Sequence, residues 1–173
     1  MKLGEELAEA RKRNGLTQEQ LAEQLPISRE SLAKYETGKR SYPEDMRPII
    51  ANAVDDPEFF FDNWENATGY VSIPYFDGEH IDQHPSSMVF LVKLETDEAL
   101  EKLKQIHWHK SIHTRSEREK EEIKQLLFEL LDAAASMINL VAVICREHKF
   151  SMKKIFTQWR LSLRSRKYIN RDI

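Results

Sequence analysis

The sequence predicts an all-α protein, with five helices in its N-terminal part and a helical bundle or hairpin in its C-terminal part. Apolar residues recur at three- and four-residue steps through most of the chain, which is the period of an amphipathic helix. All five glycines and all six prolines lie before residue 86, so the C-terminal half lacks the two residues that most often end a helix. Ser, Thr and Asp precede several apolar runs, as helix N-caps do.

The five N-terminal helices are expected to begin and end at recognisable residues. Thr17 and Ser28 can cap the second and third helices, and Gly38 can end the third. Asp56 followed by Pro57 has the residue types of an N-cap and a first helical position, which predicts the start of the fifth helix. The residues expected to face inward from the first four helices are, in chain order, Leu3, Leu7, Ala10, Leu21, Ala22, Leu25, Leu32, Tyr35, Met46, Ile49, Ile50 and Ala53.

Three further helices are expected after residue 85. The stretch 86–106 reads as mostly helical, although "MVFLV" within it also fits a strand. Ser116 and Glu119 form a capping-box pattern at the start of one long helix, about 117–148, and Ser151 can cap a last one. The apolar residues at helical spacing are, in the long helix, Ile123, Leu126, Leu127, Leu130, Ala134, Met137, Val141 and Ile144, and, in the last helix, Ile155, Phe156, Trp159 and Leu163.

These elements divide the chain into a domain at 1–65, an irregular connector at 66–85 and an all-helical part at 86–173. The connector holds two glycines, two prolines and several aromatic residues, which is typical of an ordered but irregular segment. The segment "INLVAVIC" is apolar on nearly every side of the expected helix, so it must be buried on several sides. The single helix that follows it cannot bury all of them. We therefore expect a homodimer through the C-terminal helices, with these residues of the long helix at its core: Leu127, Leu130, Met137, Val141 and Ile144.

The charge is strongly polarised along the chain. Residues 1–68 and residues 69–148 each carry nine Lys/Arg and fourteen Asp/Glu, a net charge of −5, whereas residues 149–173 carry a net charge of +7. A generally basic, nucleic-acid-binding protein is thereby excluded, and only local patches could bind a polyanion. Three roles stay open for the basic tail: a helix docked on 117–148 with solvated charges, a second nucleic-acid contact, or a contact with a partner or a membrane surface.

Few residues suggest other chemistry. Cys145 is the single cysteine and lies in an apolar run, so no disulfide framework is possible and a buried structural thiol is expected. The N-terminus shows no apolar signal-peptide core, and the longest apolar run is too short to span a bilayer, so we expect a cytoplasmic protein with no membrane partner.

A histidine-rich connector and loop raise the alternative of a metal- or ligand-responsive sensor. The residues concerned are His80, His84, His107, His109 and His113, together with Asp77, Glu79 and Asp82. No cysteine cluster accompanies them, and "EHIDQH" is not the H-E-x-x-H metal motif, so solvated histidines are favoured. Without a glycine-rich phosphate loop, a nucleophile elbow or a catalytic triad, we expect no enzymatic activity, no metal and no cofactor.

The segment "LTQEQLAEQLPISRESLAKYETGK" has the pattern of a helix-turn-helix, with Ala22 where the two helices cross and Leu32 and Tyr35 as anchors. Together with "LGEELAEARKRNG", it closely resembles the Xre/phage-repressor type of helix-turn-helix over about residues 2–62. The resemblance implies a five-helix, lambda-repressor-like DNA-binding domain that binds double-stranded DNA.

The resemblance also implies a set of DNA contacts. Arg29, Glu30 and Lys34 match positions that face base edges in the major groove, and Ser31 lies on the same exposed edge. The residues that match phosphate contacts are Gln18, at the start of the second helix, and Thr37, Lys39 and Arg40, after the third. The chemistry agrees, because Arg can fork onto guanine, Glu can accept from cytosine, and Lys can reach guanine or phosphate. Alternatively, Glu30 and Lys34 form an ordinary i,i+4 ion pair on a solvated helix face.

Pro26 departs from the resemblance, because glycine is common at that position of the turn. Proline fixes φ near −65° and disfavours helical angles at Leu25, so the second helix is expected to end early and the pitch of the third to differ. The caps and anchors remain, so the fold is expected to form.

The overall layout also resembles Xre-type regulators encoded in phages and prophages of Gram-positive bacteria, which have a similar connector and an all-helical extension. The first hypothesis is therefore a sequence-specific transcriptional regulator, a repressor of phage or prophage type, acting as a dimer on an inverted repeat. The second is a protein–protein adaptor or antitoxin-like module whose helix-turn-helix domain binds a protein instead of DNA.

Overall fold

The structure, a computed structural model, describes residues 3–69 and 71–170, whose regular secondary structure is helical with no strand. The all-α fold class expected from the sequence is confirmed. The chain forms two compact units, the first comprising Met1–Tyr75 with Cys145–Ile173 and the second Phe76–Ile144. The expected division at residues 65 and 86 stays a prediction.

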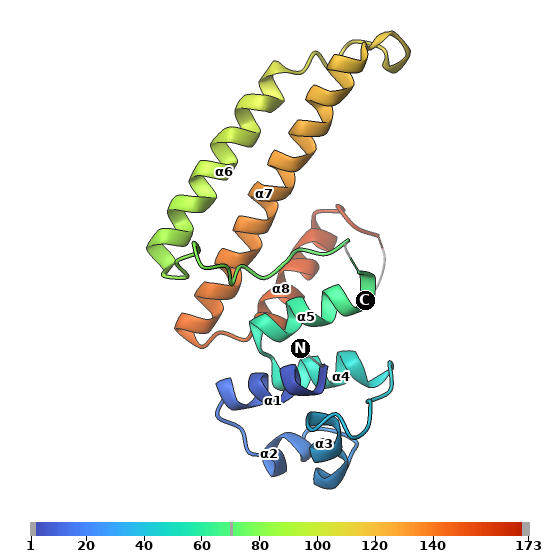
Figure 1. Cartoon of the computed structure of the whole chain (residues 1–173), viewed down its shortest axis with the longest axis vertical. Helices are drawn as coiled ribbons and strands as arrows, with labels where there is room; N and C mark the ends of the chain where they lie inside the picture. The colour runs from blue at the N-terminus through green and yellow to red at the C-terminus, as the bar shows by residue number, and fades with distance from the viewer. Residues whose placement is uncertain (1–2, 70, 171–173) are drawn as a thin grey trace. The chain divides into compact units, whose positions relative to one another are not determined.

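The first unit holds six helices among the described residues (Figure 1). The expected caps are present, because Thr17, Ser28, Asp56 and Ser151 each accept a backbone N–H from the first turn of the helix that follows. The helices are α1 (Leu3–Arg13), α2 (Gln18–Ala22), α3 (Arg29–Glu36), α4 (Met46–Val54), α5 (Pro57–Thr68) and α8 (Met152–Ser165).

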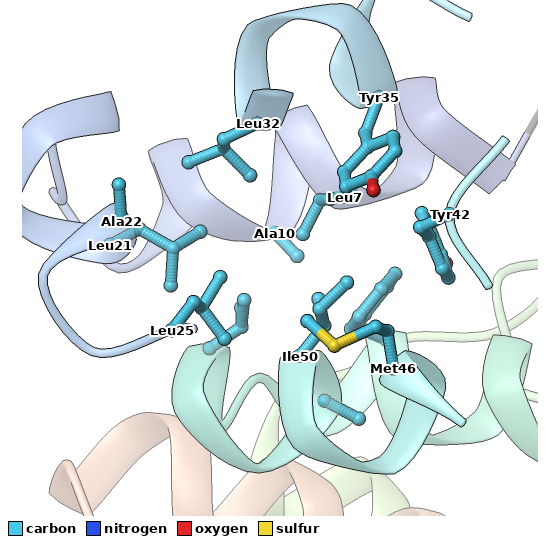
Figure 2. Close-up of a cluster of buried hydrophobic side chains, with 13 residues drawn as sticks. Leu7, Ala10, Leu21, Ala22, Leu25, Leu32, Tyr35, Tyr42, Met46 and Ile50 are labelled. Atoms are coloured by element: carbon cyan, nitrogen blue, oxygen red, sulfur yellow. The ribbon is translucent and has the colours of Figure 1, made fainter. Parts of the chain in front are cut away.

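The core of this unit is formed by the inward faces of α1 to α5 and the α3–α4 loop (Figure 2). Most of the residues expected to face inward are buried there. One expectation was wrong, because Ile49 is 42% exposed, whereas Leu3 and Ala53 are partly buried and pack against the cluster. The buried residues are Leu7, Ala10, Leu21, Ala22, Leu25, Leu32, Tyr35, Tyr42, Met46, Ile50, Ala51, Val54 and Phe59.

Helices α1 and α3 approach so closely that only glycine fits at their contact. Gly4 is buried on α1, and a Cβ added there would lie 2.0 Å from the backbone carbonyl oxygen of Tyr35. A backbone atom cannot move aside as a flexible side chain can, so Gly4 sets the separation of the first helix and the third.

Polar contacts fix the α4–α5 junction and the start of α8. Arg13 forms a two-point ion pair with Asp56, with N···O distances of 2.6 and 3.1 Å. Asp55, whose φ of 49° is left-handed, accepts the backbone N–H of Lys153 at 3.0 Å. Helix α8 is therefore bonded to the α4–α5 turn, within the same unit as the helix-turn-helix.

The exposed side of α8 differs from the expectation. Ile155 and Trp159 were expected to face inward but are 39% and 50% exposed, whereas Phe156 and Leu163 are partly buried. Only Met152 among the residues of α8 is fully buried. The tail helix thus presents both cations and apolar side chains to solvent.

The second unit is built on two long helices, α6 (Pro85–Gln105) and α7 (Glu117–His148), with a short 3-10 turn, η1 (Ile112–Thr114), between them. The last four residues of α7, from Cys145 on, belong to the first unit. The segment "MVFLV" is helical. The expected capping box is present at α7, because Glu119 accepts the backbone N–H of Ser116 at 2.7 Å and Ser116 accepts that of Glu119 at 3.3 Å.

One side of the α6–α7 pair is polar. Lys102 of α6 forms an ion pair of 2.7 Å with Glu129 of α7. Carboxylate oxygens of Glu95, Glu129 and Asp132 lie within 4.8 Å of one another, and burial together with Asp132 raises the pKa of Glu95. The connector also packs on α7, where the backbone N–H of Phe76 donates to the side chain of Asn139.

The apolar residues of α7 that were expected at the core of the homodimer are mostly exposed within the chain. Leu127, Leu130, Met137 and Ile144 are 54%, 39%, 42% and 36% exposed, and Val141 is partly buried. The side chains that are buried come from other positions, among them Leu126, Ala133, Ser136 and Val143. These five residues were expected at the core of a homodimer, so their exposure within one chain leaves that expectation a prediction. By length and composition α7 could cross a membrane, but a core helix of a soluble protein passes the same test.

Candidate nucleic-acid interface

Helices α2 and α3 form a compact pair held by buried apolar residues. Thr17 and Gln20 make a complete capping box at the start of α2, and Ser28 accepts the backbone N–H of Ser31 at the start of α3. Leu21 and Ala22 of α2 are buried, and so is Leu32 of α3. Both helix starts are thus fixed locally by hydroxyl caps, as the sequence predicted.

The turn between them is built without a left-handed residue. Helix α2 ends at Ala22, and the backbone N–H groups of Gln24 and Leu25 donate to carbonyls three residues earlier, Leu21 and Ala22, each at 3.1 Å. No residue from 23 to 28 has a positive φ, and Pro26 is exposed. Two consecutive turns with i→i+3 hydrogen bonds therefore change the chain direction where a left-handed glycine is common, and they shorten α2.

The residues expected to face base edges lie on α3 away from its buried anchors. Arg29, Glu30 and Lys34 are exposed, and Ser31 is partly buried beside the cap. Arg29 Nε lies 2.8 Å from Glu19 Oε1 of α2, in an ion pair whose side chains are both more than half exposed. The pKa of Glu30 is lowered by its own backbone N–H and by Ser28, so it is anionic at neutral pH.

The residues expected to contact phosphate differ in how they are held. Gln18 points inward, because its Nε2 donates to Glu36 Oε2 at 2.9 Å. Thr37 Oγ1 donates to the carbonyl of Ala33 at 2.8 Å. The guanidinium of Arg40 lies 5.9 Å from the centre of the Tyr35 ring. Lys39, like Thr37 and Arg40, is exposed just after α3.

A buried carboxylate, that of Glu36, connects α1, α2 and α3 by hydrogen bonds. It was not predicted from the sequence. Glu36 accepts from Arg11 Nε at 2.6 Å and Nη2 at 2.9 Å, as well as from Gln18. Arg11 also donates to the carbonyl of Leu16, and its pKa is raised by the hydrogen bond to Glu36. The available signal was an acidic residue on the inward side of the third helix, next to Tyr35, which demands a basic partner.

A family of helix-turn-helix domains matches residues 2–53 of the chain. The N-terminal part is accordingly a helix-turn-helix domain, which indicates a DNA-binding regulator in general terms. The match covers 52 of the 173 residues, so it identifies this domain and not the whole protein. No match was found among curated proteins or among solved structures.

Proposed function

We propose that the protein is a sequence-specific, DNA-binding regulator of transcription that reads duplex DNA with α3. The observation that carries this proposal is the side of α3 opposite Leu32 and Tyr35, where an arginine, a glutamate and a lysine are exposed on a helix of a helix-turn-helix domain. These side chains have the donor and acceptor groups that distinguish base pairs in the major groove.

In this proposal Arg29, Glu30, Ser31 and Lys34 contact base edges. Arg29 exchanges Glu19 for a base, which is inexpensive because an exposed ion pair contributes little to stability. The proposed phosphate contacts are Gln18, Thr37, Lys39 and Arg40, which follow or flank α3. Gln18 can reach phosphate only by leaving Glu36, so we expect its contribution to be small unless DNA rearranges it.

We further propose that the protein acts as a homodimer on an inverted repeat, joined through its C-terminal helices. A single α3 makes few base contacts, and residues 1–68 carry a net charge of −5, so one domain alone binds DNA weakly. The action as a repressor of phage or prophage type rests on the resemblance to such regulators. Enzymatic activity, cofactors and membranes have no part in the proposal, and the expected location is the cytoplasm.

An adaptor or antitoxin-like module is the second candidate, favoured by two observations. The domain is acidic, and two of the expected DNA-contacting side chains already bond to other side chains of the same domain. Arg29 pairs with Glu19, and Gln18 donates to Glu36. A module that uses this domain to hold a protein would need no base preference.

Selection from a random duplex library with the full-length protein separates the two candidates. A regulator enriches an inverted repeat whose half-sites are centred about 10 base pairs, or a multiple, apart. If no sequence is enriched even at low salt, DNA reading is excluded and the adaptor is favoured. Expression of a reporter placed behind the enriched sequence then falls if the regulator is a repressor.

A further inference from the structure

The second unit has one long apolar face that its own described residues leave largely exposed. On α7 this face is a stripe of eight residues, called here the apolar stripe. Successive members are one or three residues apart, and the stripe runs for about 26 Å at 1.5 Å per residue. Its members are Leu127, Leu130, Leu131, Ala134, Met137, Ile138, Val141 and Ile144.

Helix α7 carries two parallel series of residues, called here seams, that are spaced at alternating steps of three and four, as in a heptad repeat. The first seam is at least partly buried within the chain, and the second lies in the apolar stripe. Leu126, Glu129, Ala133, Ser136, Leu140 and Val143 follow one another at steps of three and four, and all are buried or partly buried. The stripe contains a parallel series with the same steps, Leu127, Leu130, Ala134, Met137, Val141 and Ile144. A helix with two such seams packs against two neighbouring helices, as in a four-helix bundle.

Helix α6 extends the same face. At 100° per residue, Leu100 lies about 160° around α6 from Lys102, which marks the polar side of the pair. Asp132, at that polar side on α7, lies almost opposite the apolar stripe. Val89 and Leu100 are 54% and 50% exposed and share one side of α6. The hairpin therefore has a polar flank and an apolar flank, and the apolar flank includes residues of both helices.

The exposed area is sufficient for a dimer. The exposed fractions of the five largest exposed stripe residues, with those of Val89 and Leu100, correspond to roughly 600 Å² of apolar surface per chain. Burial of all of it in two copies removes about 1,200 Å², which reaches the range of specific interfaces. Only a third of the most apolar 18-residue window of α7 is buried within the chain.

A lipid bilayer is a poorer occupant for this face. A helix placed across the membrane would carry Glu129 and Asp132 into it, and Glu129 is paired with Lys102 of α6. Helix α6 itself carries seven charged residues between positions 93 and 104. A second copy of the chain offers the same apolar face and leaves the polar flanks in water.

We propose that the apolar stripe, with Val89 and Leu100, binds the same face of a second copy to form a four-helix bundle with twofold symmetry. This inference rests on the proposed function only in assuming a dimer, and it assigns the surface that makes it. Ala134 is the smallest residue of the stripe and lies near its middle, so the two α7 helices approach most closely there. In a twofold interface the residue nearest the axis faces its own copy.

Sedimentation equilibrium of the full-length protein without DNA is the direct test. We expect wild type to be a dimer at micromolar concentration and the double variant Leu130→Asp/Met137→Asp to be a monomer with unchanged far-UV circular dichroism. The matched control is Phe90→Asp/Leu94→Asp, which places two acids at exposed apolar positions on another side of α6 and should leave the dimer intact.

Cysteine cross-linking keeps the proposal testable if the stripe variant fails to fold. In a Cys145→Ala background, Ala134→Cys should form a disulfide-linked dimer on mild oxidation, whereas Gln125→Cys, exposed outside the stripe, should not. A monomeric wild type without a cross-link at position 134 overturns the proposal. If that monomer floats with anionic phospholipid vesicles, the membrane is the occupant instead. None of these outcomes depends on DNA, so failure here leaves the library selection as a separate test of the proposed function.

Discussion

At the scale of single residues, the first unit depends on contacts that allow no larger or differently charged side chain. Gly4 touches the carbonyl of Tyr35, and Glu36 holds Arg11 and Gln18 in a buried position. Both features lie where α1 meets α3. A change at either residue alters the contacts on which α3 packs.

Replacement of Gly4 by alanine is expected to lower the free energy of unfolding by about 1–3 kcal/mol, because α1 and α3 must separate to admit the methyl group. Thermal unfolding measures this change. The matched control is Gly78→Ala, where an added Cβ meets nothing within 4 Å. Equal stability of the two variants would contradict the close approach.

Asp62 predicts an unusual pH dependence of stability. Burial, together with Glu6, raises the pKa of Asp62 to about 7. Its pKa in the unfolded chain is about 3.9, so the folded state binds this proton more tightly. The contribution of Asp62 to stability is therefore full below pH 4 and is lost as the pH rises to 7.

The variant Asp62→Asn is consequently expected to be more stable than wild type at pH 8, by about 1–2 kcal/mol after allowance for partial exposure, and to gain nothing at pH 4. Urea unfolding at the two pH values provides the measurement, with Asp97→Asn on the exposed side of α6 as the control. A gain that is equal at both pH values would show that the carboxyl does not titrate as described.

At the scale of elements, Glu36 couples α1, α2 and α3. Glu36→Gln removes the charge that faces the guanidinium of Arg11, and both side chains are nearly buried, 4% and 11% exposed. We expect a loss of about 3 kcal/mol in unfolding free energy, because an unpaired buried cation remains. Glu9→Gln, which breaks the exposed pair with Lys12, should change stability little. If both variants unfold alike in urea, Glu36 is not a structural centre.

The elements also show how far the sequence could be interpreted. Helix starts followed directly from local chemistry, because Thr17, Ser28, Asp56, Ser116 and Ser151 bond to the turn beside them. Pro26 predicted that α2 ends early, and α2 does end at Ala22. The exposure of Ile49 and the contact at Gly4 depend instead on how distant helices pack, which no local pattern contains. The expected DNA-contacting residues had the same limit. They came from the resemblance to a family, which gives their positions along the chain, but the inward turn of Gln18 follows from its hydrogen bond to Glu36.

The C-terminal half illustrates the same limit. Helical spacing identified the range of α7 correctly, yet it could not decide between two parallel seams. The buried seam includes Glu129 and Ser136, whose polarity hides it from a hydrophobic pattern, while the more apolar seam is exposed. A pattern of apolar residues predicts that a helix face is buried, but it does not show whether residues of the same chain or of another molecule bury it.

At the scale of the whole molecule, the net charge and the proposed twofold symmetry together determine the expected affinity for DNA. The first unit carries eighteen basic and sixteen acidic residues, and the second carries eight and thirteen. Neither unit is basic enough for strong sequence-independent binding. In the proposed dimer, affinity for DNA therefore comes from two α3 helices that bind at once.

Separation of the two copies should therefore weaken operator binding without altering what each domain reads. We expect Leu130→Asp/Met137→Asp to bind the full inverted repeat at least about 100-fold more weakly than wild type, since the second contact is no longer intramolecular. Its affinity for a single half-site should equal that of the wild-type domain. Fluorescence anisotropy titrations of both duplexes test this, and an unchanged affinity for the inverted repeat would show that the apolar stripe is not needed on DNA.

The base preference of Arg29→Ala tests most directly whether α3 reads sequence. Affinities of wild type and variant are measured for the enriched duplex and for every single-base-pair change within one half-site. The account predicts that the variant loses about 1–3 kcal/mol on the enriched duplex and no longer discriminates at one base pair, while preferences elsewhere persist. A uniform loss on all duplexes, with every preference retained, would contradict base reading by Arg29 and leave it a phosphate contact.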